Sequence, residues 1–206
     1  TVVKVLSRSP VIVRKIITLG EQLETDPGII KDILRFNDEE LTDEKIEEKH
    51  EETLVLIEQI GKTFEKINQL QAKLLEIPMS KKPQHRRAWW NLGRARVQLA
   101  RLVRSLEVSN TEKLRLVGLM KETVEQMRAL EHELNKLERK ADHMKKENRK
   151  VVQKDIRAVK AKIVDLEEQT KSSALELKRT LQKIMTAQSQ AEIAKREIVE
   201  GNLRLV

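Results

Sequence analysis

The sequence predicts an all-α protein, an elongated helical bundle of about six helices that includes a long antiparallel helical hairpin. Charged residues make up 36% and hydrophobic residues 39% of the 206 positions, whereas aromatic residues reach only 2%. This balance is typical of long solvated helices and not of sheets. Apolar residues also recur at steps of three and four positions along most of the chain, which is the spacing of a helix with one buried face. We therefore expect a monomer without strands.

The N-terminal third contains three expected helices. The first begins at Ser9-Pro10, where serine is a favourable N-cap and proline fits the first turn, and it ends near Leu23. Asp26-Pro27-Gly28 is a turn signal, and a short second helix follows it. Thr42 is the expected N-cap of a long third helix, which has acids in its first turn and ends near Glu76.

An arginine-rich helix is expected after the break at Ile77-Pro78-Met79-Ser80. Its apolar face carries Leu92, Ala95, Leu99, Leu102 and Leu106. Its opposite face carries Arg87, Asn91, Arg94, Gln98 and Arg101. This helix is therefore predicted to bury its leucines and to present its arginines to solvent or to a partner.

Charge is distributed unevenly along the chain, whose net charge is +8. Positions 38 to 52 hold nine acidic residues and two lysines, whereas positions 81 to 104 hold eight basic residues and no acid. A basic surplus of this kind suggests a polyanionic partner. The candidate basic surface consists of Arg87, Arg94, Arg101 and Arg104. The alternative is that these arginines form a solvated helix face and nothing more.

The C-terminal half predicts further long helices. Ser109 and Glu112 have the spacing of a capping box, which opens a helix of several turns. The apolar pattern weakens near Asn148 and then resumes as far as Ile184, so we expect two helices that meet in an antiparallel hairpin. One continuous helix is the alternative, because no glycine or proline enforces a turn. A second capping-box spacing begins at Ser189 and opens the expected last helix.

Several classes of function are disfavoured by what the sequence lacks. Without cysteine there is no disulfide, no thiolate metal site and no cysteine nucleophile. The four histidines have no metal-ligand spacing, and there is no glycine-rich phosphate loop or Gly-x-Ser-x-Gly motif. We therefore expect no enzyme and no cofactor. No apolar segment approaches the roughly 18 residues of a membrane span and no secretory signal opens the chain, so we expect a cytoplasmic protein.

The last segment, residues 191–206, reads Ala-Glu-Ile-Ala-Lys-Arg-Glu-Ile-Val-Glu-Gly-Asn-Leu-Arg-Leu-Val. It closely resembles the helix that opens the second conserved region of bacterial primary sigma factors, a basic helix followed by Glu-Ala-Asn-Leu-Arg-Leu-Val. The matching residues are Glu197, Glu200, Asn202, Leu203, Arg204 and Leu205. Gly201 departs from the family, which usually has alanine there, and a glycine costs a helix about 1 kcal/mol.

A second resemblance lies near the N-terminus. Ser9-Pro10, Val13, Leu19-Gly20-Glu21 and Leu23 are similar to the stretch that follows the first conserved region of the family. The resemblance therefore implies three parts: residues 1–25 follow the first conserved region, residues 26–188 form the non-conserved insertion, and residues 189–206 begin the second conserved region. We expect both ends of the chain to be cuts in a longer protein, because it opens without methionine and ends within the apolar pattern.

The resemblance implies a parent protein that binds core RNA polymerase, recognises promoter DNA and initiates melting. This piece would be accessory: it would pack on the second sigma domain, approach the largest polymerase subunit and modulate initiation and promoter escape. Alone it should not bind DNA sequence-specifically. The rival hypotheses are a free-standing helical scaffold or coiled-coil protein and a nonspecific nucleic-acid binder.

Trp89 and Trp90 are similar to the tryptophan pair with which sigma factors hold promoter DNA open. The family's pair, however, follows the Asn-Leu-Arg-Leu-Val helix, whereas this pair precedes it by about a hundred residues. The two pairs are therefore not equivalent. We expect Trp89 and Trp90 to be buried where two helices pack, in preference to stacking on bases.

Overall fold

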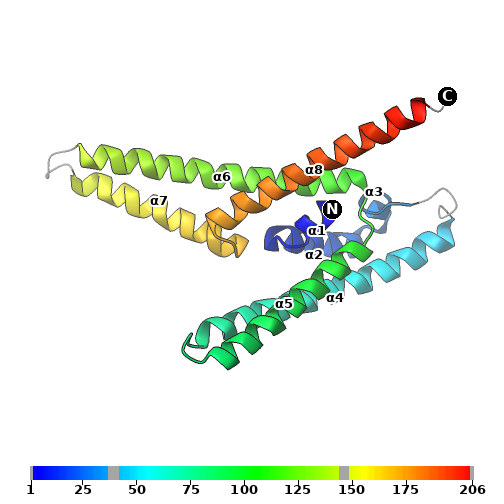
Figure 1. Ribbon diagram of the computed structural model, residues 1–206, viewed down its shortest axis with the longest axis horizontal. Helices are drawn as coiled ribbons and strands as arrows, with labels where there is room; N and C mark the ends of the chain where they lie inside the picture. The colour runs from blue at the N-terminus through cyan, green and yellow to red at the C-terminus, as the bar shows by residue number, and fades with distance from the viewer. Residues whose placement is uncertain (1, 37–41, 144–148, 205–206) are drawn as a thin grey trace. The chain divides into compact units, whose positions relative to one another are not determined.

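A computed structural model describes residues 2–36, 42–143 and 149–204 (Figure 1). In these residues it contains eight α-helices, one short 3-10 helix and no strand. The all-α prediction is therefore confirmed, and there are more helices than the six or so expected. The elements are α1 (Val2–Leu6), α2 (Pro10–Thr25), η1 (Pro27–Ile29), α3 (Ile30–Ile33), α4 (Asp43–Glu76), α5 (Lys82–Ser105), α6 (Asn110–Asp142), α7 (Arg149–Thr170) and α8 (Ala174–Leu203).

The chain forms two compact units, which divide within α6 between Leu116 and Val117. The expected divisions after residues 25 and 188 fall inside these units. Since those divisions describe a relation to a protein family, they remain predictions.

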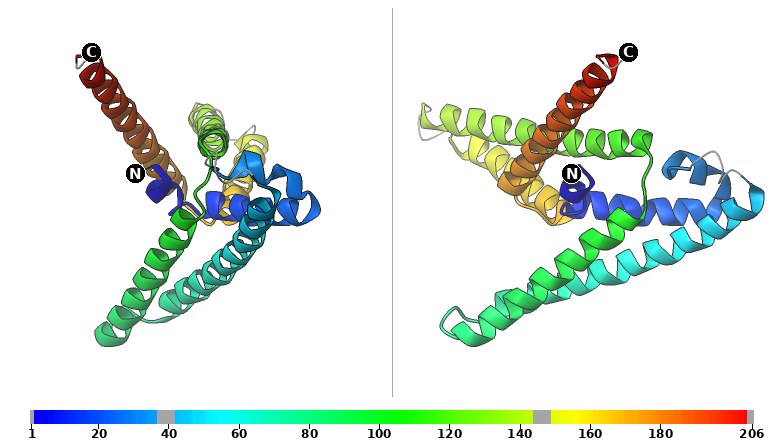
Figure 2. Two further views of the ribbon diagram at one scale, coloured as in Figure 1. Left: turned by 90° about the vertical axis from the view of Figure 1, so that its right-hand side faces the viewer. Right: turned by 45° about the vertical axis from the view of Figure 1, so that its right-hand side comes forward.

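In the first unit α4 packs against both α2 and α5. Helices α4 and α5 run antiparallel, as Figures 1 and 2 show, and α4 extends over 34 residues, about 50 Å at 1.5 Å per residue. The apolar stripes of these helices form the core. Its members include Ile12, Ile16, Leu23, Ile57, Ile60, Phe64, Ile67, Leu92, Leu99 and Val103. The predicted ends of α2 and α4 are confirmed to within about two residues.

Helices α2 and α4 are in close contact at Gly20. A Cβ atom at this position would lie 2.6 Å from Cγ2 of Ile57 on α4, closer than any side chain can tolerate. Ile57 is itself buried, so it cannot swing into solvent to make room. Glycine at position 20 therefore serves the contact between two helices and does not end α2.

The segment between α5 and α6 is held against the end of α3. An isolated antiparallel bridge pairs Leu34 with Val108, and the backbone N–H of Ser109 donates to the carbonyl of Ile33 at 2.8 Å. The hydroxyl of Ser109 accepts from the backbone N–H of Glu112 at 3.1 Å. Ser109 is therefore the N-cap that its spacing predicted.

In the second unit α6 and α7 lie side by side and antiparallel in all views (Figures 1 and 2). An ion pair of 2.9 Å joins Glu138 of α6 to Lys160 of α7. The turn predicted near Asn148 lies outside the described residues. The core of this unit includes Met120, Val124, Met127, Val159, Leu177 and Ile184. Leu166 of α7 is only half-buried.

The helix predicted to continue to Ile184 is interrupted after Thr170. Lys171 has a left-handed backbone, with φ at 49°. The N–H groups of Lys171 and Ser172 donate to the carbonyls of Glu168 and Glu167, both at 3.3 Å, which is the Schellman pattern of a helix end. The prediction of one helix through this point was therefore wrong.

Ser173 and Glu176 then form a complete capping box that starts α8. The hydroxyl of Ser173 accepts from the N–H of Glu176 at 3.3 Å, and the carboxylate of Glu176 accepts from the N–H of Ser173 at 3.4 Å. An ion pair between Lys178 and Glu131 connects α8 to α6. Ser189, the predicted N-cap, lies inside α8 instead.

Candidate polyanion-binding surface

The candidate arginines of α5, Arg87, Arg94, Arg101 and Arg104, lie on the face that points away from the core. Positions seven apart on a helix differ by only about 20° in direction, so Arg87, Arg94 and Arg101 share a face. All three are exposed, as is Arg104, and this part of the prediction is confirmed. The buried face consists of Leu92, Ala95, Leu99 and Val103, with Leu106 directly after the helix. Leu102, predicted to belong to it, is half-buried.

The prediction that Trp89 and Trp90 are buried is wrong. Their exposed fractions are 56% and 54%. Trp90 lies two positions before Leu92 and therefore points to the opposite side of α5. The two indoles touch each other edge to face, with centroids 5.5 Å apart and planes at 81°. The pair thus forms an exposed aromatic patch on the first half of α5.

Apolar side chains alternate with the arginines along this face. Trp90 lies three positions after Arg87 and four before Arg94, and Val97, which is 53% exposed, has the same spacing between Arg94 and Arg101. We call the resulting set the α5 row: Arg87, Trp90, Arg94, Val97, Arg101 and Arg104. It spans about 25 Å at 1.5 Å per residue. Trp90 and Val97 were missed from sequence, although their spacing from the arginines was a signal that could have found them.

The positive charge of the α5 row is not neutralised by acids. In the described part of the chain no ion pair involves an arginine of α5. The side-chain hydrogen bond of Arg104, from Nε to the carbonyl of Ala100 at 3.0 Å, leaves its charge uncompensated. Neighbouring guanidinium groups repel one another, and a polyanion would relieve that repulsion.

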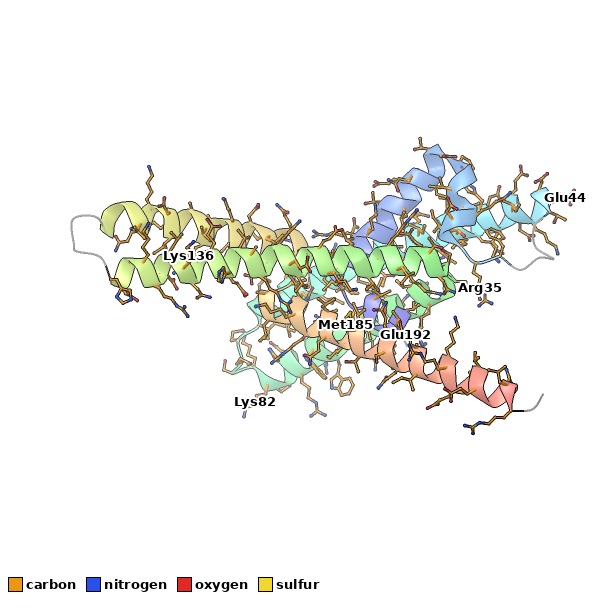
Figure 3. The ribbon with its side chains drawn as sticks, turned by 90° about the horizontal axis from the view of Figure 1, so that it is seen from above. Arg35, Glu44, Lys82, Lys136, Met185 and Glu192 are labelled. Atoms are coloured by element: carbon orange, nitrogen blue, oxygen red, sulfur yellow. The ribbon has the colours of Figure 1, made fainter. Side chains whose placement is uncertain are left out.

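The acid-rich stretch lies at the far end of the same unit. Its described acids are Asp43, Glu44, Glu47, Glu48, Glu51 and Glu52, and all are exposed. Figure 3 shows Glu44 at the beginning of α4 and Lys82 at the beginning of α5, at opposite ends of the pair of helices. Charge of opposite sign is therefore separated along this unit, which favours a defined orientation toward a charged partner.

The residues for which the sequence predicts a sigma-factor motif lie at the end of α8. Glu197, Glu200, Asn202, Leu203 and Arg204 are all exposed, and Leu205 lies outside the described residues. Every residue from 189 to 204 is exposed. Among them are four large apolar residues, Ile193, Ile198, Val199 and Leu203, and Leu203 is 72% exposed. This part of α8 therefore presents an apolar surface that its own unit does not cover.

The described residues contain no group of three or more histidine, cysteine, aspartate or glutamate side chains that could hold a metal ion. His50, one of the four histidines, contacts the carbonyl of Leu23 through Nε2 at 3.2 Å and so belongs to the packing of α4 on α2. None of the described helices has the length and apolarity needed to cross a bilayer.

The chain carries two candidate recognition surfaces, the α5 row and the end of α8. No protein-family model matches the sequence, and no curated protein matches it. The relation to primary sigma factors is therefore a hypothesis that depends on residues 191–206 and on the weaker N-terminal similarity.

Proposed function

We propose that the chain is part of a bacterial primary sigma factor, comprising its non-conserved region and the opening helix of its second conserved region. The parent would direct RNA polymerase to promoters in the cytoplasm, and this piece would be an accessory, non-catalytic module that modulates initiation and promoter escape. The observation that carries the proposal is the match of residues 191–206 to the family motif.

The environment of the motif supports this proposal. Residues 191–203 lie on the single helix α8, and their apolar side chains have no cover within their own unit. Leaving a large apolar side chain in water forgoes about 1.5 to 3 kcal/mol of burial. Further helices of a second sigma domain would cover Ile198, Val199 and Leu203. A free-standing scaffold would have to cover them by self-association.

The most direct test is the coding sequence beyond Val206. The proposal requires the reading frame to continue into the helices that bind the polymerase clamp and read the minus-ten element. A stop codon directly after Val206 would overturn it. Sedimentation of the purified chain addresses the rival hypothesis, since a concentration-dependent dimer that Leu203→Arg dissolves would indicate a self-associating scaffold.

The role of the arginines is tested in the full-length parent by reversing Arg87, Arg94 and Arg101 to glutamate. These side chains are exposed, so folding should survive. We expect a shorter open-complex lifetime and a changed ratio of abortive to full-length transcripts, because guanidinium groups bind phosphates and carboxylates alike. The loss should shrink with salt, which screens charges over about 10 Å at 0.1 M.

A matched control for this experiment reverses Lys136, Arg139 and Lys140 of α6, which are exposed as well. It changes the net charge equally at a different place. Preference for the minus-ten sequence should not change in either variant, because backbone contacts position a complex and base contacts specify it. If both variants and the parent have the same open-complex lifetime and transcript ratio at low salt, the arginines form only a solvated helix face.

A further inference from the structure

The tryptophans of α5 differ from the other aromatic residues of the chain. The chain has two phenylalanines, of which Phe64 is buried and Phe36 lies beneath the ammonium group of Lys49, 5.0 Å from its ring centroid. Trp89 and Trp90 are more than half exposed, and their rings contact each other. Two exposed indoles lie beside arginines that form no ion pair within the described residues. Such a surface is suited to a ligand that offers both flat apolar groups and negative charge.

We infer that the α5 row, together with Trp89, binds single-stranded nucleic acid without sequence preference. Phosphates would contact Arg87, Arg94 and Arg101, and unpaired bases would stack on the indole of Trp90. Single strands combine repeated negative charge with bases whose faces are free, and stacking on aromatic side chains is tolerant of sequence. This inference depends on the geometry of α5 and not on the proposed relation to sigma factors.

The order of side chains along the row fits this class of ligand. Trp90 lies about 5 Å along the helix from Arg87 and about 6 Å from Arg94, so an indole is flanked on both sides by guanidinium groups. A strand that follows the row would therefore have phosphate contacts before and after a stacked base. A duplex would engage the arginines but leave the indoles unused, since its bases are already stacked on one another.

The perpendicular arrangement of the two rings assigns them different tasks. Because their planes make an angle of 81°, one base cannot lie flat on both. Trp90 belongs to the row and would stack on the base. Trp89 contacts Trp90 edge to face and lies outside the row, so it is a positioning residue that supports the Trp90 ring.

An anionic membrane is the competing ligand. Leu75 and Met79, near the connection between α4 and α5, are exposed as well, and tryptophan with basic residues is also typical of membrane interfaces. The arginines, however, continue for about 20 Å from Trp90 to Arg104 without a continuous apolar band beside them. The observations therefore favour a linear polyanion.

The experiment measures binding of the full chain to a labelled oligo(dT) strand, to a duplex of equal length and to vesicles of phosphatidylcholine with phosphatidylglycerol. We expect tighter binding of the single strand than of the duplex, with quenching of the tryptophan fluorescence, since the chain has no other tryptophan. The slope of log affinity against log salt should be about −0.7 for each phosphate contact.

Variants assign the binding to the row. Trp90→Ala should weaken oligo(dT) binding about tenfold or more, the expected loss of one stacked base, whereas Trp90→Phe should retain part of it. Trp89→Ala should have a smaller effect. Replacing Arg87, Arg94 and Arg101 by glutamine should flatten the salt slope by about 0.7 per contact removed. Replacing Lys136, Arg139 and Lys140 by glutamine removes the same charge and should leave the slope nearly unchanged.

Three results would overturn the inference. They are equal affinity for single strand and duplex, an unchanged affinity for oligo(dT) in Trp90→Ala, and binding to the vesicles but not to oligo(dT). Leu175→Ala, which removes an exposed apolar side chain from α8, is the control for nonspecific loss of apolar surface. Circular dichroism of each variant should match that of the parent chain, because every substituted side chain is exposed.

Discussion

The connection between α4 and α5 and the connection between α7 and α8 are specified by different chemistry. Residues 77–81 form the first, where Pro78 cannot donate a backbone hydrogen bond and restricts the residue before it, so α4 must end. Residues 171–173 form the second and contain neither proline nor glycine. There, hydrogen bonds of Glu167, Thr170, Ser173 and Glu176 end one helix and start the next.

The difference explains which of the two connections could be predicted. A proline acts through its covalent ring, so its effect is visible at one position. A capping network acts only when all its members fold together, and the same residues are compatible with a helix interior. Ser173 with Glu176 and Ser189 with Glu192 have the same spacing, yet α8 begins at the first pair and continues through the second.

The largest effect is expected in the cores of the two units. Leu99→Ala should lower the free energy of unfolding of the first unit by about 2 to 5 kcal/mol, because Leu99 is buried on the apolar face of α5. Leu166→Ala should cost the second unit only about 1 to 2 kcal/mol, because part of its side chain is already in water. Urea unfolding followed by circular dichroism measures both, with a separate fit for each unit if two transitions occur. Equal losses would mean that α7 is packed more deeply than described.

The next effect compares the two capping-box sequences. Ser173→Ala should cost about 1 kcal/mol, since it removes the acceptor for the N–H of Glu176. Ser189→Ala should cost nothing and can add up to about 0.5 kcal/mol, because alanine is the better residue in a helix interior. The same unfolding experiment measures both variants. A larger loss for Ser189→Ala would place the start of the last helix where the sequence alone suggested it.

The smallest effect concerns the left-handed residue at the end of α7. Lys171→Gly should raise stability by about 0.5 to 1 kcal/mol, because glycine adopts a positive φ without the steric cost that a side chain meets. Lys183→Gly, within α8, is the matched control and should lower stability by about 1 kcal/mol. Thermal unfolding of both variants measures the sign. A loss for Lys171→Gly as large as that of the control would argue for a continuous helix at this point.

Much of the fold followed from the sequence because helix period and proline are local signals. The bounds of α2 and α4, the N-cap at Ser109 and the exposed arginines of α5 were all predicted correctly. The burial of Trp89 and Trp90 was predicted wrongly from residue type alone. Trp90 shares the helical phase of the arginines, and phase determines exposure more reliably than hydrophobicity does. Which apolar surfaces remain bare, as on α8, depends on tertiary packing and could not be inferred.

The contact of Gly20 with Ile57 has a consequence for how this sequence could change over time. Gly20 lies in the segment that we propose to follow the first conserved region of a sigma factor, whereas Ile57 lies in the proposed insertion, so one position constrains the other across that boundary. Any side chain at position 20 would require a smaller residue at position 57, and a larger residue at 57 would push the helices apart. The two positions should therefore vary as a pair. The rest of α4 can diverge more freely, provided that its apolar stripe persists.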